Sequence, residues 1–199
     1  MEHRQVPTVT LTPPTDWDRA SLAGLWHVWQ EDWRVNGRSP FVPGTQAMTI
    51  FRLGQWLDDP RRNALVRLVA SGLYKTGAIY ARFVLGLEFR KETKIGRRVE
   101  FAHQHGVVID PHTEIGDEVL ILHGVTIGLR LSVADAENPS FGAKIGARVT
   151  IGAGAKIIGA VRIGDDATIG PNAVVMTDVP ARGSVVAAPS RVLRIRSDS

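Results

Sequence analysis

The sequence contains no cysteine among its 199 residues. Disulfide frameworks, thiolate metal sites and cysteine nucleophiles are therefore excluded together. No run approaches the roughly 20 apolar residues that a membrane-spanning helix requires. The first residues also lack the apolar stretch and small-residue cleavage site of a secretory signal. These absences predict a cytoplasmic protein without a membrane span.

Aromatic residues are missing from the last part of the chain, where none follows Phe141, while all five tryptophans precede residue 60. The formal net charge is +4. A nucleic-acid-binding protein needs its basic residues clustered with base-stacking aromatics, and the basic residues near 61–67 and 90–98 do not show that pattern. We interpret them as surface charge or as a site for an anionic small molecule, and we expect no nucleic-acid partner.

Residues 16–86 are predicted to form a helical region after a flexible N-terminus at 1–15. Apolar residues recur there at three- and four-residue spacings, which predicts amphipathic helices at about 17–35, 45–57 and 63–85. We expect the apolar stripe of each helix to pack into the core. The stripe of the first helix contains Leu22, Leu25, Trp26, Trp29 and Trp33, and that of the third contains Leu65, Leu68, Val69, Leu73, Ile79, Tyr80, Phe83 and Val84.

A period of six residues takes over after Leu87. Its positions are Ile109, Ile115, Ile121, Ile127, Ile145, Ile151, Ile157, Ile163, Ile169 and Val175, and glycine follows most of them. Helices need a period near 3.6 and flat strands a period of 2. A sustained six is typical of hexapeptide repeats, in which three units complete one triangular coil of a parallel β-helix.

The predicted fold is therefore α+β, with the helical region followed by a left-handed parallel β-helix of roughly five coils at 87–190. A short C-terminal tail follows at 191–199. The repeat is interrupted at 129–142, which predicts one extruded loop, and such loops carry function more often than stability.

Three segments of the repeat region read Gly86-Leu87-Glu88-Phe89, Ala102-His103-Gln104-His105-Gly106 and Leu122-His123-Gly124-Val125-Thr126-Ile127-Gly128. These segments resemble the serine acetyltransferase family. The resemblance covers roughly residues 30–195. The chain also resembles colanic-acid-type acetyltransferases found with exopolysaccharide genes. It implies transfer of acetyl from acetyl-CoA, as co-substrate, to the hydroxyl of serine or a serine-like acceptor, without a metal ion.

The resemblance also implies roles for single residues. His103 occupies the position of the family's catalytic histidine, which acts as general base, and Glu88 stands where the family has the aspartate of a catalytic dyad. A carboxylate that accepts the ring N–H of such a histidine fixes its tautomer and stabilises the imidazolium. Asp32, Arg90 and His123 correspond to substrate-binding positions. The cofactor-binding positions implied for CoA are Gly128, Ala153, Pro171 and Arg191.

Some positions depart from the family pattern and leave other functions open. The residue before His103 is Ala102, where the family has an aspartate that holds the substrate amine, and residues 140–143 replace an arginine–histidine pair. These losses leave open a sugar or natural-product hydroxyl as the acceptor. Four histidines lie between 103 and 123, which leaves a metal-dependent hydratase open. A non-catalytic scaffold is kept open beside it.

The resemblance predicts a homotrimer, because the family's active site lies between the flat sides of two chains. The expected assembly is either this homotrimer or a dimer of trimers in which the helical region pairs the two trimers. Serine acetyltransferases that bind cysteine synthase use a tail ending in isoleucine, whereas this chain ends at Ser199. We therefore expect no stable cysteine synthase complex and weak or absent inhibition by cysteine.

Overall fold

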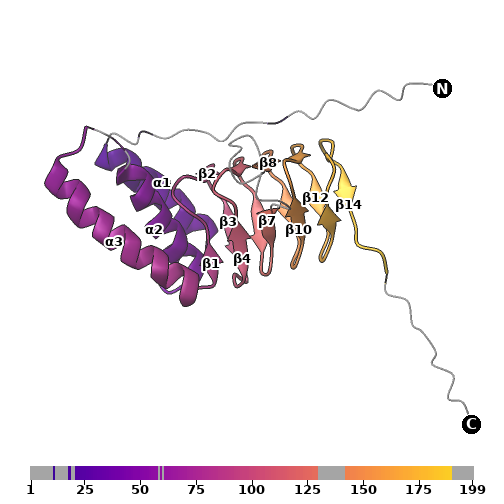
Figure 1. Cartoon of the computed structure of the whole chain (residues 1–199), viewed down its shortest axis with the longest axis horizontal. Coiled ribbons are helices and arrows are strands. Elements are labelled where there is room, and N and C mark those ends of the chain that lie inside the picture. The colour runs from indigo at the N-terminus through magenta and orange to yellow at the C-terminus, as the bar shows by residue number, and fades with distance from the viewer. Residues whose placement is uncertain are drawn as a thin grey trace, which may run out of the picture.

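Three helices precede a left-handed parallel β-helix in the computed structural model of the chain (Figure 1). The structure describes Leu11, Asp18, residues 21–57, Asp59, and residues 61–129 and 142–189. Most of the predicted segment 1–15, the interior of the loop at 129–142 and the tail 191–199 lie outside the described residues. Within those residues, no helix is long and apolar enough to cross a membrane.

The helices are α1 (Leu22–Val35), α2 (Pro43–Leu57) and α3 (Ala64–Phe83), close to the predicted ranges. Ser21 caps α1 by accepting a hydrogen bond from the backbone N–H of Gly24, and Asn63 caps α3 in the same way. α2 begins two residues earlier than predicted, at Pro43, because the fixed φ of proline suits the first turn of a helix.

The prediction that all three apolar stripes pack into the core is correct for α2 but wrong for α3. Met48 and Phe51 of α2 are buried, because α2 packs against α1, α3 and strand β3 (Glu100–Ala102). α3 approaches α2 through Ala70, Tyr74 and Gly77. Its stripe faces outward instead, with every member 40% exposed or more: Leu65, Leu68, Val69, Leu73, Ile79, Tyr80, Phe83 and Val84. In α1, Leu22 and Trp26 are also exposed.

Fourteen short strands of the described residues form three parallel sheets. The first sheet contains β1 (Leu87–Glu88), β4 (Val107–Ile109), β7 (Thr126–Leu129), β10 (Lys156–Ile158) and β13 (Val174–Val175). The second contains β2 (Lys94–Ile95), β5 (Glu114–Ile115), β8 (Lys144–Ile145) and β11 (Arg162–Ile163). The third contains β3 (Glu100–Ala102), β6 (Leu120–Leu122), β9 (Thr150–Ile151), β12 (Thr168–Ile169) and β14 (Ser184–Val185).

The six-residue period places one aliphatic side chain per flat side into the core. Ile121 lies opposite Ile151, and Ile151 lies opposite Ile169, with all three side chains fully buried. Three hexapeptides separate Ile151 from Ile169, as one triangular coil requires. Ile121 and Ile151 are separated by a whole number of hexapeptides, namely five. The six-residue repeat therefore resumes in phase after the loop. Four coils have three strands each, and a partial fifth contributes β13 and β14.

Candidate active site

The corner between β3 and β4 is longer than the next corner on the same edge, between β6 and β7. Phe101 lies opposite Ile121, and Ile109 lies opposite Ile127. The chain therefore takes two more residues to pass from Phe101 to Ile109 than from Ile121 to Ile127, and these two fall in the turn after β3. That turn begins with His103, which has a left-handed backbone with φ of 51°. Histidine is one of the few residues other than glycine that is enriched in this region.

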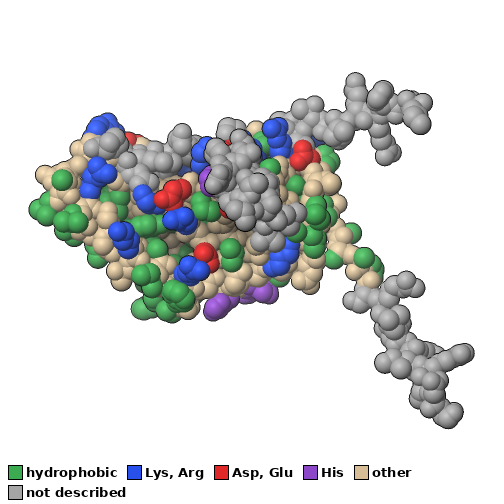
Figure 2. Space-filling view, viewed as in Figure 1, with side chains coloured by type: hydrophobic (Ala, Val, Ile, Leu, Met, Phe, Trp, Pro, Cys, Tyr) green, Lys and Arg blue, Asp and Glu red, His purple; other side chains and the backbone are tan. Residues whose placement is uncertain are grey.

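The histidine positions in the sequence converge on this corner. The backbone N–H of Gly124 donates to the carbonyl of His105 at 2.7 Å, and Gly154 donates to the carbonyl of His123 at 2.8 Å. His103, His105 and His123 are all exposed. Figure 2 shows histidine side chains gathered along one edge of the β-helix. Stacking of successive coils therefore brings His123 to the corner that carries His103.

The same corner continues into later coils as a column of small and rigid residues. Ala153 follows His123 in the column, and its carbonyl accepts a hydrogen bond from the backbone N–H of Asn172 at 2.8 Å. Pro171 immediately precedes Asn172 and is exposed. The structure thus aligns the predicted positions Ala153 and Pro171 with His123 along one edge.

A cavity of about 700 Å³ opens beside the lengthened turn. His103, Gln104 and His105 line one side of it, and residues from the end of α1 and the following loop line the other. Glu100, three residues before His103, contributes a carboxylate to the same cavity. The cavity therefore contains a candidate base and an acidic group that is suited to a substrate amine.

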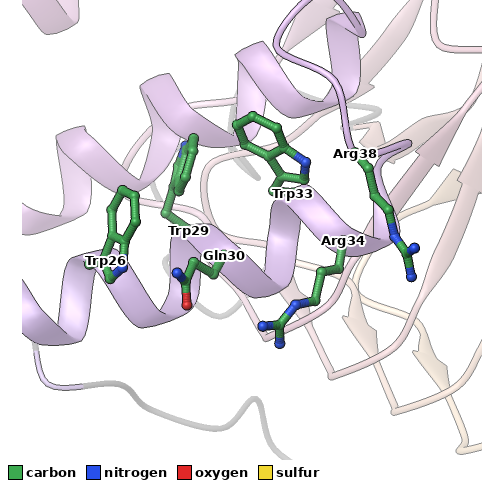
Figure 3. A pocket seen from close by; sticks show the side chains of 6 residues that line it. All are labelled: Trp26, Trp29, Gln30, Trp33, Arg34 and Arg38. Carbon is green, nitrogen blue, oxygen red and sulfur yellow. The ribbon is translucent and has the colours of Figure 1, made fainter.

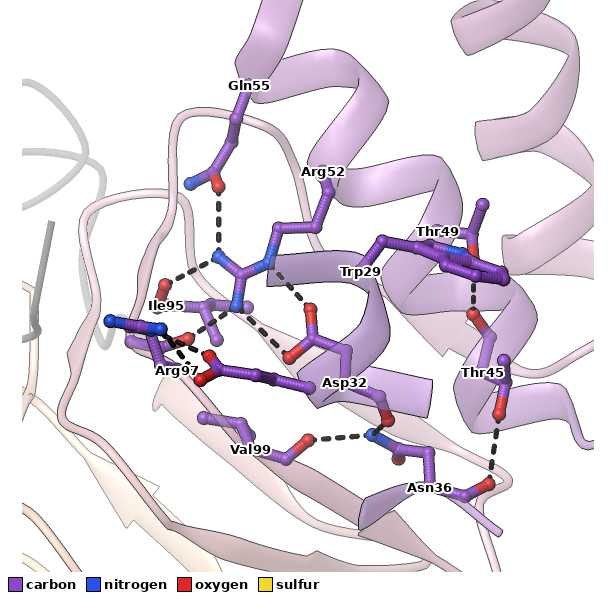
Figure 4. Close-up of polar contacts among 12 residues, drawn as sticks. Trp29, Asp32, Asn36, Thr45, Thr49, Arg52, Gln55, Ile95, Arg97 and Val99 are labelled. Atoms are coloured by element: carbon purple, nitrogen blue, oxygen red, sulfur yellow. Dashed lines mark hydrogen bonds and ion pairs between the residues drawn. The ribbon is translucent and has the colours of Figure 1, made fainter. Parts of the chain in front are cut away.

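Asn36 connects the helical region to the strand that precedes His103. Its side-chain amide donates to the carbonyl of Val99 and to that of Asp32, both at 2.9 Å (Figure 4). Its Oδ1 accepts from the backbone N–H of Phe101 at 2.9 Å. Asn36 is 3% exposed. The side chain occupies the place of a neighbouring strand at the open edge of β3, and it fixes the backbone two residues before His103.

Asp32 lies away from this cavity, in a buried ion pair. Its Oδ2 accepts from Nε of Arg52 at 2.8 Å, and both side chains are at most 2% exposed. Arg52 also donates to the carbonyls of Ile95 and Gly96 (Figure 4). Burial raises the pKa of Asp32, and Arg52 opposes that shift. Asp32 holds the helices against the β-helix through Arg52 and does not line the cavity beside His103.

Glu88 and Arg90 lie on the surface near the helix-to-strand junction. The carboxylate of Glu88 is 3.3 Å from Nε of Arg82, and Nε of Arg90 is 3.9 Å from the carboxylate of Glu92. Within the described residues, these are the ion pairs of the two side chains, and no hydrogen bond joins Glu88 to His103. The dyad of Glu88 and His103 stays a prediction.

Gly128 is required by packing whatever its role toward CoA. Its φ is 78°, and a Cβ atom there would approach Cβ of Asp110 to 2.6 Å and Oγ1 of Thr113 to 2.9 Å. Arg191, the remaining predicted CoA residue, lies outside the described residues. In the part of the chain that the structure describes, no group of three or more histidine, aspartate or glutamate side chains is arranged to hold a metal ion.

A second cavity, of about 650 Å³, runs along α1. Trp26, Trp29 and Trp33 line it (Figure 3). The ring centroids of Trp26 and Trp29 are 5.0 Å apart, and those of Trp29 and Trp33 are 4.8 Å apart. Its polar side chains are Gln30, Arg34 and Arg38. These groups include no side chain that accepts a proton near neutral pH, so the cavity beside His103 is the better candidate for acid–base chemistry.

Sequence reasoning missed Asn36 and Glu100 as members of the site. Glu100 was detectable, because outward residues of a hexapeptide strand flank the inward one, here Phe101. Asn36 was not, because its partners Val99 and Phe101 lie 63 and 65 residues away.

Comparisons with known proteins show what the chain is similar to. A family described as bacterial transferase hexapeptide (six repeats) matches residues 142–176. A serine acetyltransferase of Helicobacter pylori (strain ATCC 700392 / 26695) is 38% identical over 79 residues, which are 40% of this chain and 42% of that protein. The chain thus matches less than half the length of this curated relative.

Solved structures extend the similarity to most of the chain. The soybean serine acetyltransferase apoenzyme is 30% identical, with a TM-score of 0.66, and the match covers 85% of this chain and 69% of that one. The serine acetyltransferase of Neisseria gonorrhoeae, in complex with serine, is 26% identical, with a TM-score of 0.68, over 88% of this chain and 72% of that one.

The repeats and their β-helix place the chain in the hexapeptide-repeat class. The match to the soybean protein covers 85% of this chain, which is more than the coils alone make up. The chain belongs to the serine acetyltransferase family.

Proposed function

We propose that this protein is an acetyl-CoA-dependent O-acetyltransferase that acetylates serine or a serine-like hydroxyl. The observation that carries the proposal is the exposed His103, which lines a cavity at the lengthened corner after β3, in a chain of the serine acetyltransferase family. Acyl transfer to an alcohol needs a base at the hydroxyl, and histidine is the side chain most often used.

In this mechanism, His103 takes the proton of the acceptor hydroxyl as its oxygen attacks the thioester carbonyl. The tetrahedral intermediate then collapses, the carbon–sulfur bond breaks, and the imidazolium returns the proton to the departing thiolate of CoA. Glu88 is the predicted carboxylate partner of His103. Glu100, which lines the cavity, is suited to hold the ammonium group of serine.

Acetyl-CoA is proposed to bind along the corner that contains His123, Ala153 and Pro171. Small and rigid side chains leave room for an extended pantetheine arm, and Gly128 lies near the end of β7. A neighbouring chain would supply the other wall of this groove, so the proposed assembly is a homotrimer in which every groove is shared. Sedimentation of fully active protein as a monomer at micromolar concentration would refute this assembly.

A sugar or natural-product hydroxyl is the second candidate acceptor. Ala102 stands beside His103 where the family has an aspartate, and Asp32 is engaged by Arg52. Both observations reduce the number of carboxylates available to a substrate amine. A site without such partners discriminates less strongly in favour of an amino acid.

The test is release of CoA thiol from acetyl-CoA with serine, homoserine and a panel of sugars. Release that depends on serine supports the first proposal, and release with sugars alone supports the second. Absence of release with every acceptor, in folded protein, would contradict an acetyltransferase function. Purified His103→Ala protein is the control, because it measures the release of thiol that does not depend on His103.

A further inference from the structure

The cavity along α1 has two arginines without partners beside its row of indoles. Figure 3 shows the three indoles along the helix, Arg34 near its end and Arg38 in the loop that follows. Within the described residues, neither guanidinium group has a hydrogen bond or an ion pair. Other arginines of the described chain do have carboxylate partners: Arg61, Arg82, Arg97, Arg98 and Arg148. The cavity therefore offers two guanidinium groups to an anion.

The turn after α1 fixes one of these charges at the end of the row. Gly37 and Arg38 both have left-handed backbones, with φ of 97° and 54°. The backbone N–H of Arg38 donates to the carbonyl of Trp33, five residues earlier, at 3.0 Å. This bond is characteristic of the Schellman motif, which ends a helix by turning the chain back on its last turn. The backbone of Arg38 is thereby held beside the last indole.

The indoles form an apolar strip with polar groups at its rim. Trp29 is fixed in place, because its Nε1 donates to Oγ1 of Thr49 at 2.7 Å and the ring of Trp26 stacks on it. Trp26 is 58% exposed. The row from Trp26 to Arg34 takes up eight residues of helix, or roughly 12 Å, which is longer than a single six-membered ring. Tryptophan combines an apolar ring with an N–H donor, which suits ligands that are apolar on one face and polar at the edge.

One turn of the chain borders both this cavity and the cavity beside His103. Arg34 and Arg38 line the cavity along α1, whereas residues 35–37, which lie between them, line the cavity beside His103. A ligand that lies along the indoles therefore ends at the turn that also borders the candidate active site.

We propose that the cavity along α1 binds an acidic oligosaccharide, a chain of sugar rings that carry carboxylates, as an extension of the acceptor site. Sugar rings have C–H faces that pack against indoles and hydroxyls that hydrogen-bond Gln30. Their carboxylates fit the planar fork of an arginine. The inference rests on the second candidate acceptor of the proposed function, because the end of the oligosaccharide that passes the turn presents its hydroxyl to His103.

The arrangement of the rings favours a sugar chain over a nucleic acid or an apolar partner. The bases of a single strand stack on open aromatic faces. Here Trp26 and Trp29 lie against each other with 23° between their planes, and Trp29 and Trp33 meet edge to face at 74°. No gap is left between the rings for a base. An apolar partner would bury two guanidinium groups without a counter-charge, which is costly.

The experiment is calorimetric titration of the full chain with a tetramer of galacturonic acid, in the absence of acetyl-CoA. The tetramer should bind about tenfold more tightly than a neutral glucose tetramer, because the carboxylates add charge-assisted hydrogen bonds. High salt should reduce this difference. Trp26→Ala and Arg38→Gln should each weaken binding of the acidic tetramer by about tenfold, since each removes one principal contact.

Phe41→Ala and Arg67→Gln are the matched controls. They remove an exposed aromatic ring and an exposed arginine that line neither cavity, so both variants should bind the acidic tetramer as the wild type does. Circular dichroism melting confirms that each variant is folded. In the thiol-release assay, KM for the acidic tetramer should be about tenfold lower than KM for single galacturonic acid. Trp26→Ala should bring the two KM values together.

Several results would overturn the inference. Equal binding of the acidic and neutral tetramers would remove the role of the arginines, and wild-type binding in both groove variants would place the ligand elsewhere. Tighter binding of a single-stranded DNA of equal charge would assign the cavity to nucleic acid. A smaller assembly in Trp26→Ala, with tetramer binding intact, would assign it to a second copy of the chain.

Two further outcomes separate this inference from the proposed function. Thiol release with serine, in protein that does not bind the acidic tetramer, would overturn the inference and leave the acetyltransferase function standing. Binding of the tetramer without any thiol release from it would overturn the connection between the cavity along α1 and His103.

Discussion

The side chain of Asn36 hydrogen-bonds the backbone of Phe101 from 65 residues away, with Oδ1 2.9 Å from the amide nitrogen. β3 is the terminal strand of its sheet, so its outer edge would otherwise be unpaired. The amide of Asn36 supplies the donor and acceptor that a further strand would supply. The turn that carries His103 is thereby anchored from the helical region.

Asn36→Ala should lower the free energy of unfolding by about 1–3 kcal/mol, because it leaves the buried amide of Phe101 and the carbonyl of Val99 without partners. It should also lower kcat by about tenfold or more through displacement of His103. Thermal unfolding at fixed protein concentration and steady-state kinetics measure the two effects.

Asn63→Ala is the matched control for Asn36→Ala. Asn63 also hydrogen-bonds a backbone N–H, that of Leu65, but it caps α3 far from the cavity. Its loss should cost about 1 kcal/mol with an unchanged kcat. If Asn36→Ala likewise changed stability alone, the role in positioning His103 would be withdrawn.

His103→Ala should lower kcat by about 10² to 10⁴, the range for removal of a general base. Affinity for CoA should be nearly unchanged, since the CoA positions lie in later coils. His27→Ala, on the exposed face of α1, is the control and should retain activity. Full activity in His103→Ala would remove His103 from the mechanism.

Glu88→Gln tests the dyad. If Glu88 orients His103 during turnover, the substitution should lower kcat less than His103→Ala does and should alter the pH profile of kcat. The companion variant is Arg82→Gln, which removes the ion pair seen with Glu88. That pair is exposed and weak, so Arg82→Gln should preserve the profile. A wild-type profile in Glu88→Gln would argue against the dyad.

Glu100→Gln should raise KM for serine with a smaller effect on kcat, because its carboxylate is proposed to hold the substrate ammonium and not to move protons. An acceptor without an amine should be unaffected. Glu114→Gln is the control, because Glu114 faces outward on another sheet and pairs with Lys94 at 2.8 Å. Unchanged serine kinetics in Glu100→Gln would exclude Glu100 from the substrate site.

The β-helix was predictable from sequence because each coil repeats the same local rule. An aliphatic residue every six positions, as at Ile151 and Ile169, determines both the strand and its inward face. The lengthened corner at His103 was not predicted. Its two additional residues shift the strand register at that corner alone, and the six-residue spacing of the aliphatic side chains continues unchanged from Ile109 onward.

The helical region was predicted in extent but not in burial. The period of α3 marks one face as apolar, and a period cannot say whether that face meets the same chain or another. Ala70 and Gly77 face α2, since small residues allow the closer approach. The partners of Asp32 were equally hidden, because Arg52 and Asp32 belong to different helices.

The ion pair of Asp32 and Arg52 yields the final prediction, on stability. Asp32→Asn should lower the free energy of unfolding by about 3–5 kcal/mol, because it leaves the guanidinium of Arg52 buried without a counter-charge. Asp32→Leu combined with Arg52→Met should be less damaging than the two single changes added together, since it removes both charges. It should not restore wild-type stability, because the carbonyls of Ile95 and Gly96 lose their donor. Melting temperatures at one protein concentration measure all of these variants, and additive losses would show that the pair is not coupled.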